Sequence, residues 1–343
     1  MRTVRWGVLS TASIATEKVI PGLGRADRSE VLAIASRDGE RARATAGRLG
    51  IPRAYGSYEA LLADPDVDAV YIPLPNHLHA EWTAAAARAG KHVLCEKPLA
   101  MTADEARAMF AAARTHGVLL REAYPYMAQP QTLRLRELLR EGVVGRVRSL
   151  SATMGFRIVT PEGEPLCDPA NIRLQPERGG GALLDAGTYA MSLVRIAAGE
   201  RPVRAFAAAR WAKSGVDQTV AATLEFASGT IAQISCSMSG AFHRKALIVG
   251  EKGAIETSYS NHAPAGGTLP LSVKRGIPGV IPFEVETLPA ADGFRLEAES
   301  FARMVRGGAQ HWTGATEAES IDIAMALEAI AESARAGHWV PVG

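Results

Sequence analysis

The chain has 343 residues, 47% of them hydrophobic, and its 38 basic and 36 acidic residues leave a net charge of +2. This composition supports about two folded domains and excludes an intrinsically disordered chain. Because no long basic run occurs and aromatic residues are few, the sequence does not indicate a nucleic-acid-binding protein. No stretch of about 18 apolar residues occurs, so no membrane partner is expected.

The cysteines and the first residues indicate the compartment. Cys95, Cys167 and Cys236 are an odd and sparse set, which argues against a disulfide framework. Residues 1–7 lack the apolar run of a signal peptide. We therefore expect a cytoplasmic protein with reduced thiols.

The first 123 residues alternate short apolar runs with helical segments. Strands are expected at 4–10, 31–36, 54–55, 69–73, 92–96 and 118–122. Helices are expected from residue 11 to about 24 and at 39–49, 58–63, 79–88 and 102–115. Continuously apolar strands that alternate with helices predict a parallel sheet covered by helices on both faces.

The remainder of the chain has a different pattern. After a connecting helix at 131–141, strands are expected at 147–154, 203–212, 216–226, 230–237, 245–249 and 254–258. Several alternate with a period of two, which predicts a mainly antiparallel sheet with one face against helices. The other face is expected to be solvated or to pack on a second subunit. A loop or edge strand is expected at 266–282, and helices at 295–306 and 316–336.

The first strand leads into a candidate dinucleotide-binding turn. The usual pattern is Gly-x-Gly-x-x-Gly, whose glycines let the backbone approach a pyrophosphate at a helix N-terminus. Here Gly7 is the only glycine, and small residues follow it. The residues expected to contact the cofactor in this turn are Gly7, Ser10, Thr11, Ala12, Ser13 and Ile14.

The end of the second strand indicates which dinucleotide binds. Folds that bind NAD usually place Asp or Glu there, whereas this chain has Ser36 and Arg37. A guanidinium group suits the 2′-phosphate of NADP, and Arg41 lies one helical turn further on. NADP(H) is therefore preferred, while Asp38 keeps NAD(H) open.

Four motifs in order carry a family resemblance. They are Pro75-Asn76-His77-Leu78-His79, Cys95-Glu96-Lys97-Pro98, the linker start Glu122-Ala123-Tyr124, and residues 168–173 followed by 179–189. This series resembles the glucose–fructose oxidoreductase / inositol dehydrogenase (Gfo/Idh/MocA) family over nearly the whole chain. Within it, the chain looks most like the branch of NADP-dependent D-xylose dehydrogenases, dimeric dihydrodiol dehydrogenases and glucose–fructose oxidoreductase.

The resemblance implies an α/β fold with two domains. An N-terminal Rossmann domain at 1–123 would bind NADP. A C-terminal α+β domain at 124–343, with an open-faced, mainly antiparallel sheet, would bind substrate and form a homodimer or homotetramer through that sheet. The resemblance also implies a Lys97–Pro98 bond that is often cis, and further cofactor contacts from Leu74, Pro75, Asn76, His79, Glu96 and Lys97.

The candidate catalytic residues are Lys97, Tyr189 and Asp185. Oxidation of an alcohol removes a proton from oxygen and a hydride from carbon, so a group of tunable pKa must reach that oxygen. Tyr189, with an ordinary pKa of about 10, is assigned as acid/base, and the Lys97 ammonium as charge stabiliser. The reverse assignment stays open because the two groups would titrate together. Asp185 would orient the substrate or the lysine.

The candidate substrate residues lie where the chain departs from the family pattern. They are Tyr126, Met127, Gln129, Asn171 and Arg173. Of these, the linker residues Tyr126, Met127 and Gln129 suggest a pocket with less charge and more capacity for stacking. No metal site is expected, because His77, His79 and Cys95 lack the spacing of zinc ligands.

The sequence therefore predicts an NAD(P)-dependent oxidoreductase acting on CH–OH groups. The preferred substrate is a sugar or a sugar-derived alcohol or ketone. Two alternatives stay open: a reductase of trans-dihydrodiols or diketones, and a non-catalytic dinucleotide-binding regulator. Retention of both Lys97 and Tyr189 disfavours the regulator.

Overall fold

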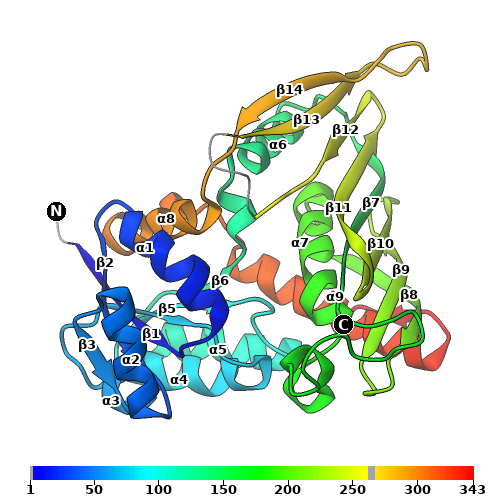
Figure 1. Cartoon of the computed structure of the whole chain (residues 1–343). Helices are drawn as coiled ribbons and strands as arrows, with labels where there is room; N and C mark the ends of the chain where they lie inside the picture. Colours follow the sequence, from blue (N-terminus) through cyan, green and yellow to red (C-terminus); the bar gives the residue numbers. More distant parts are fainter. Residues whose placement is uncertain (1–2, 262–266) are drawn as a thin grey trace. The chain divides into compact units, whose positions relative to one another are not determined.

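The computed structural model describes residues 3–261 and 267–343, shown in Figure 1. The chain divides into two compact units. Unit 1 contains Met1–Ala100, Asp104–Ala128 and Asp292–Glu317. Unit 2 contains Met101–Ala103, Gln129–Ala291 and Ala318–Gly343. The expected division at residue 123 thus differs from these units, chiefly because residues 292–317 return to unit 1.

Unit 1 is built on a six-stranded parallel sheet, with order β3-β2-β1-β4-β5-β6. Its strands are β1 (Val4–Leu9), β2 (Ser29–Ala35), β3 (Arg53–Tyr55), β4 (Ala69–Ile72), β5 (His92–Glu96) and β6 (Leu120–Ala123). This is the strand order of a Rossmann fold, and it confirms the predicted fold of this part. Such sheets bind ligands beyond the carboxyl ends of their strands, where the order reverses between β1 and β4.

Helices connect these strands. They are η1 (a π-helical turn, Ala15–Val19), α1 (Ile20–Arg25), α2 (Gly39–Leu49), α3 (Tyr58–Leu62), η2 (Asn76–Leu78), α4 (His79–Arg88), α5 (Ala103–Thr115) and η3 (Pro125–Ala128). From the C-terminal part of the chain come α8 (Gly293–Gly307) and η7 (Ala309–His311). The observed α2, α4 and β5 have the predicted bounds.

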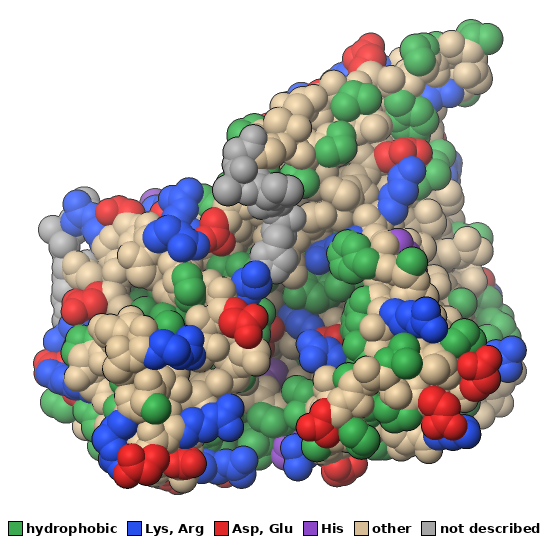
Figure 2. Space-filling view, viewed as in Figure 1, with side chains coloured by type: hydrophobic (Ala, Val, Ile, Leu, Met, Phe, Trp, Pro, Cys, Tyr) green, Lys and Arg blue, Asp and Glu red, His purple; other side chains and the backbone are tan. Residues whose placement is uncertain are grey.

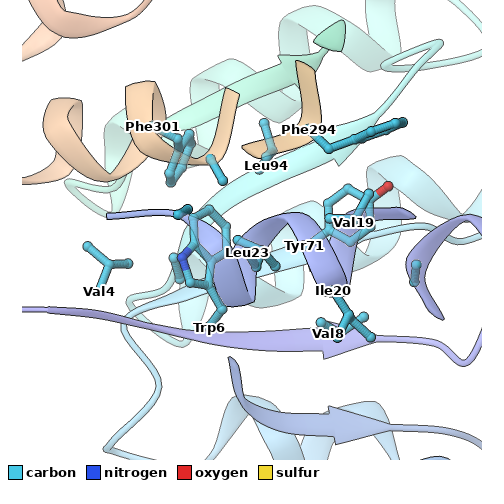
Figure 3. Close-up of a cluster of buried hydrophobic side chains, with 14 of the residues drawn as sticks. Val4, Trp6, Val8, Val19, Ile20, Leu23, Tyr71, Leu94, Phe294 and Phe301 are labelled. Carbon is cyan, nitrogen blue, oxygen red and sulfur yellow. The ribbon is translucent and has the colours of Figure 1, made fainter. Parts of the chain in front are cut away.

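The core of unit 1 explains why α8 belongs to it. Phe294 and Phe301 of α8 lie in one buried cluster with Trp6 of β1, Leu23 of α1 and Tyr71 of β4 (Figure 3). The rings of Trp6 and Phe301 have centroids 5.1 Å apart. Because aromatic side chains bury large apolar areas, this contact fixes a distant segment of the chain on the sheet.

Unit 2 contains a nine-stranded sheet with order β14-β13-β12-β11-β7-β10-β9-β8-β15. The strands are β7 (Val147–Arg157), β8 (Pro202–Trp211), β9 (Asp217–Phe226), β10 (Ile231–Ser237), β11 (Ser239–Gly250), β12 (Gly253–Thr257), β13 (Thr268–Arg275), β14 (Glu284–Pro289) and β15 (Val340–Pro341). Only the β7–β10 pair is parallel among these, so the predicted mainly antiparallel sheet is confirmed.

The predicted loop or edge strand at 266–282 needs correction. Residue 266 lies outside the described residues, and half of the following segment is β13, the strand next to the edge. The edge itself is β14, which the sequence did not predict. Its burial alternates only between exposed and half-buried residues, so it lacks the apolar periodicity of a core strand.

Helices cover one face of the unit 2 sheet. They are α6 (Pro130–Arg140), α7 (Thr188–Ala198) and α9 (Glu317–Ala336), with the short turns η4 (Ile172–Leu174), η5 (Pro176–Arg178) and η6 (a π-helical turn, Leu183–Gly187). Ser333 of α9 accepts a hydrogen bond from the Ala207 N–H of β8. On the opposite face, residues such as Phe206 and Ile231 are exposed while their neighbours Ala207 and Ala232 are buried. In the described parts of the chain, no helix has the length and apolar character to cross a membrane.

Candidate active site

The carboxyl edge of the unit 1 sheet gathers the residues predicted to bind a dinucleotide. Ser10 directly follows β1, Ser36 and Arg37 follow β2, and Leu74 to Asn76 follow β4. Glu96 ends β5, and Lys97 comes next. Since this edge includes the point where the strand order reverses, these segments lie where Rossmann folds bind their cofactors.

The turn after β1 has a backbone conformation typical of glycine, although it contains no glycine. Ser10 has φ 147°, a conformation that side-chain-bearing residues rarely adopt, and its Oγ accepts a hydrogen bond from the Ala12 N–H at 3.0 Å. The helical segment starts at Ser13 and continues through η1. Ser10, Ala12 and Ala15 therefore occupy the three glycine positions of the fingerprint, a register that the sequence does not indicate because none of the three residues is glycine.

Gly7 is closely packed inside unit 1, and the cofactor contact predicted for it stays a prediction. It lies inside β1, paired with Ala33 and Val70, and precedes the turn by three residues. A Cβ atom at this position would lie 2.5 Å from Leu61 Cδ2. The structure thus explains Gly7 by close packing of β1 against α3.

The residues after β2 are arranged for a phosphate rather than for a ribose hydroxyl. Asp38 caps α2, because its Oδ1 accepts from the N–H groups of Glu40 and Arg41. Arg37 and Arg41 are exposed, and in the described part of the chain neither forms an ion pair with a carboxylate. Both lower the pKa of the nearby Tyr58 phenol, which burial raises. The segment therefore presents two cations.

The Lys97 loop is held by buried groups. The Lys97–Pro98 bond is cis, as the resemblance implied, and the Lys97 N–H donates to Glu96 Oε2 at 3.2 Å. The other carboxylate oxygen of Glu96 accepts from the Tyr71 hydroxyl at 2.5 Å. Glu96 thus stabilises the loop from within the protein, and the cofactor contact predicted for it stays a prediction.

His79 fixes the same loop. Its Nδ1 lies 2.9 Å from the Pro98 carbonyl oxygen, and its Nε2 lies 2.8 Å from the Leu74 carbonyl oxygen. The ring is fully buried, and burial lowers the pKa of the imidazole. His79 therefore bridges the loops that contain Leu74 and Pro98, and the cofactor contact predicted for it stays a prediction.

In unit 2, the helical segment from Ala182 to Ala198 carries Asp185 and Tyr189. Asp217 Oδ2 accepts from the Leu183 N–H at 2.6 Å, so a carboxylate from β9 caps the buried start of this segment. Gly181 has φ 115°, and a Cβ there would lie 2.2 Å from Asp217 Oδ1. The glycine run at 179–181 is therefore a steric requirement and not a flexible turn.

Asp185 is paired with a second predicted residue. Its Oδ2 lies 2.7 Å from Arg173 Nε, and this carboxylate raises the pKa of the guanidinium. Tyr189 also raises the pKa of Arg173, so the three side chains share one environment. Asn171 Oδ1 accepts from the Arg173 N–H at 3.1 Å. The structure thus brings together four residues that the sequence predicted.

Two residues near Tyr189 were not predicted. Asn261 Nδ2 donates to the Tyr189 hydroxyl oxygen at 2.9 Å. The Arg244 guanidinium lies 4.3 Å from the centre of the Tyr189 ring and 4.5 Å from that of Tyr259. Neither residue belongs to a recognisable motif, so only the three-dimensional structure reveals them.

Three predicted substrate residues of the linker are buried. Tyr126 and Met127 lie in η3, with exposed fractions of 0% and 1%. Gln129 is also fully buried, and its Nε2 donates to the carbonyl oxygens of Asn261 and Ala291. Its Oε1 accepts from the Ala291 N–H. Gln129 therefore holds the backbone, and the substrate contact predicted for it stays a prediction.

The surface charge and the potential metal ligands do not indicate a further binding site among the described residues. On the face shown in Figure 2, acidic and basic side chains are interspersed. No group of three or more His, Cys, Asp or Glu side chains is arranged for a metal within the described residues. Cys95, Cys167 and Cys236 are free thiols, and burial raises the pKa of Cys95 and Cys236.

These features define an oxidoreductase with a dinucleotide-binding Rossmann unit and a separate α+β unit. The family described as "Oxidoreductase family, NAD-binding Rossmann fold" matches residues 4–124, and "GFO/IDH/MocA C-terminal domain" matches residues 132–256. The chain belongs to the Gfo/Idh/MocA oxidoreductase family, which confirms the resemblance.

Relatives of known activity match nearly the whole chain. D-xylose 1-dehydrogenase (NADP(+)) 2 of Haloferax volcanii is 39% identical and covers 98% of both proteins. Trans-1,2-dihydrobenzene-1,2-diol dehydrogenase of Danio rerio is 33% identical and covers 92% of both. A crystal structure of a 3-ketoreductase from Actinomadura kijaniata with NADP and TDP-benzene has a TM-score of 0.83 at 34% identity, covering 97% of this chain and 98% of the other.

The Asp217 cap predicts a pH dependence of stability. Burial raises the pKa of Asp217 from 3.8 to about 6, so between these values the folded protein binds more protons than the unfolded chain. The free energy of unfolding then falls as pH rises from about 4 to about 6, by roughly 3 kcal/mol for this group. Asp217→Asn keeps an acceptor for Leu183 and loses this dependence.

Denaturant unfolding at pH 4.5 and pH 7 measures the effect. The wild type should lose stability relative to Asp217→Asn over this interval, whereas the exposed control Asp104→Asn should follow the wild type. Parallel pH profiles for wild type and Asp217→Asn would contradict the assignment.

Proposed function

We propose that the protein is an NADP(H)-dependent oxidoreductase that transfers a hydride between the nicotinamide and an alcohol or ketone carbon of a sugar. The observation that carries the proposal is the gathering of the turn at Ser10, the cations Arg37 and Arg41, and Lys97 at the carboxyl edge of a Rossmann sheet. Its relatives named for D-xylose and for a 3-ketoreductase support a carbohydrate-like substrate.

The residues at this edge fit the cofactor. A tight turn at Ser10 followed by a helix N-terminus suits a pyrophosphate. Arg37 and Arg41 suit a 2′-phosphate, and the use of Asp38 as a helix cap disfavours NAD. Pro75 and Asn76, in the segment after β4, would contact the nicotinamide half.

The side chains of the protein contribute general acid–base catalysis to this reaction. When bound, the cofactor accepts the hydride in the direction of oxidation and donates it in the direction of reduction. During oxidation, the ionised phenol of Tyr189 takes the proton from the substrate hydroxyl, and the Lys97 ammonium stabilises negative charge on that oxygen. In reduction, Tyr189 returns the proton to the same oxygen. Asp185, paired with Arg173, orients other substrate hydroxyls.

A second candidate function is the oxidation of trans-dihydrodiols or the reduction of diketones, supported by the similarity to the dihydrodiol dehydrogenase. The same residues would act on either substrate class. A purely regulatory dinucleotide-binding role would leave Lys97 and Tyr189 without a use, so we place it last.

We further propose a cytoplasmic homodimer or homotetramer that associates through the open face of the unit 2 sheet. The free thiols fit a reducing compartment. Exposed apolar residues on that face, such as Phe206 at 39% and Ile231 at 49%, fit burial against a second copy.

The cofactor preference should depend on the two arginines after β2. Removing a charge-assisted hydrogen bond costs about 1.5–3 kcal/mol, so Arg37→Ala combined with Arg41→Ala should raise the Kd for NADPH about 10-fold or more. Binding of NADH should change little. Cofactor fluorescence titration measures both, with Arg43→Ala as the control because its ion pair with Glu40 is exposed. Equal losses for NADPH and NADH would contradict the 2′-phosphate assignment.

Turnover should require both Lys97 and Tyr189. Acid–base groups contribute about 100-fold or more, so Lys97→Ala and Tyr189→Phe should each lower kcat by at least that factor with NADPH binding retained. Assays with D-xylose, keto-sugars and a trans-dihydrodiol identify the substrate class, with exposed Lys252→Ala as the control. Full turnover in either catalytic variant would contradict the mechanism, and cofactor binding without turnover of any substrate would favour a regulator.

Self-association should be sensitive to the open sheet face. Ile231→Lys places a charge on that face and should shift the molar mass measured by light scattering towards the monomer. Val280→Lys adds the same charge at a site exposed by 92% between β13 and β14, and it should leave the mass unchanged. A monomeric wild type, or an unaffected Ile231→Lys variant, would contradict this interface.

A further inference from the structure

The surroundings of the Tyr189 phenol contain a second polar side chain, Asn261, that no motif identifies. Tyr189 has an exposed fraction of 6%, and its hydroxyl oxygen accepts from Asn261 Nδ2 at 2.9 Å. A donor on the phenol oxygen stabilises the ionised phenol over the neutral one. The Arg244 guanidinium on the ring face acts in the same direction, because a cation favours the electron-rich ring and the phenolate charge.

Several groups hold Asn261 in this place. Gln129 Nε2 donates to the Asn261 carbonyl oxygen at 3.1 Å. Two residues earlier, Tyr259 has φ 37°, a strained conformation for an aromatic residue. Tyr259 is fully buried, and its hydroxyl donates to the Thr153 carbonyl oxygen at 2.7 Å. Strain that buried contacts maintain is typical of functional segments, and here it directs the chain into Asn261.

The second polar atom of the Asn261 side chain, Oδ1, is evidence for a bound ligand. Its Oδ1 is buried, and no donor among the described residues reaches it. A buried acceptor without a partner destabilises the folded protein, so proteins rarely retain one unless a ligand or a water molecule donates a hydrogen bond to it. Asn261 therefore binds the Tyr189 hydroxyl through Nδ2, and its Oδ1 remains available to accept a hydrogen bond from a ligand.

We propose that Asn261 is a substrate-binding residue whose Oδ1 accepts a hydrogen bond from the hydroxyl next to the reacting carbon, while its Nδ2 orients the Tyr189 phenol. This inference rests on the proposed function, in which Tyr189 exchanges the proton of the reacting oxygen. It narrows the substrate to a compound with two neighbouring oxygens, a vicinal diol or an α-hydroxy ketone. Sugars and dihydrodiols share this unit. Arg244 acts through Tyr189 and is a positioning residue.

The first test compares substrates with and without the neighbouring hydroxyl. The pairs are D-xylose with 2-deoxy-D-xylose, and trans-cyclohexane-1,2-diol with cyclohexanol, each assayed with NADP⁺. The wild type should prefer the vicinal member in kcat/KM by about 10-fold or more, the value of one hydrogen bond. Asn261→Ala should lose most of this preference. The control is Ser260→Ala, which should keep the preference, because the Ser260 hydroxyl donates to the Ser258 carbonyl oxygen.

The second test measures how the ionisation of the Tyr189 phenol affects the pH dependence of kcat/KM. Asn261→Asp replaces the donor on the phenol oxygen by a carboxylate of the same size, so the pH of half-maximal kcat/KM should move to higher values. Arg244→Met should move it in the same direction, with rescue by Arg244→Lys. A residue with only a structural role would not shift this profile, and NADPH titration verifies that each variant is folded.

The outcomes separate the two claims. An unchanged substrate preference in Asn261→Ala, or unchanged pH profiles in Asn261→Asp and Arg244→Met, would overturn this inference while leaving the proposed function intact. Absence of turnover by the wild type with every compound would overturn the proposed function, and the inference with it.

Discussion

The helical segment that carries Asp185 and Tyr189 depends on one hydrogen-bonded cap. Its first N–H groups would be unsatisfied inside unit 2, and the Asp217 carboxylate accepts from Leu183. The carboxylate reaches this point because Gly181 has no Cβ. Once the start of the segment is fixed, Asp185 meets Arg173, and the Tyr189 ring lies beside Arg244. The positions of Asp185 and Tyr189 in unit 2 therefore depend on the contact between Asp217 of β9 and the start of this helical segment.

Both units use a π-helical turn where functional residues are expected. In unit 1 the turn Ala15–Val19 follows the candidate pyrophosphate segment, and in unit 2 the turn Leu183–Gly187 contains Asp185. Such turns are rare and occur often at functional sites, because an extra residue in the turn changes the direction of the side chains. Each helix then continues as regular α-helix, so the altered segment stays on a rigid support.

The sequence predicts features that depend on local pattern. The helices α2 and α4 have the bounds that the sequence predicts, because periodicity and terminal residues such as the Asp38 cap of α2 determine them. Features that depend on contacts between distant residues were missed. The return of α8 to unit 1 depends on packing of Phe301 against Trp6. The positioning role of Gln129 depends on backbone 132 residues away in the chain, at Asn261. Ser10 was predicted as a contact, but its glycine-like backbone conformation has no sequence signal.

We propose Lys97 and Tyr189 as the catalytic groups for a sugar-like substrate. A crystal structure of the protein with NADP⁺ and D-xylose, or the best substrate of the panel, tests this proposal most directly. We expect Lys97 Nζ and Tyr189 Oη both to lie within hydrogen-bond distance of the hydroxyl on the carbon that faces the nicotinamide. A complex in which either side chain is remote from that hydroxyl would contradict it.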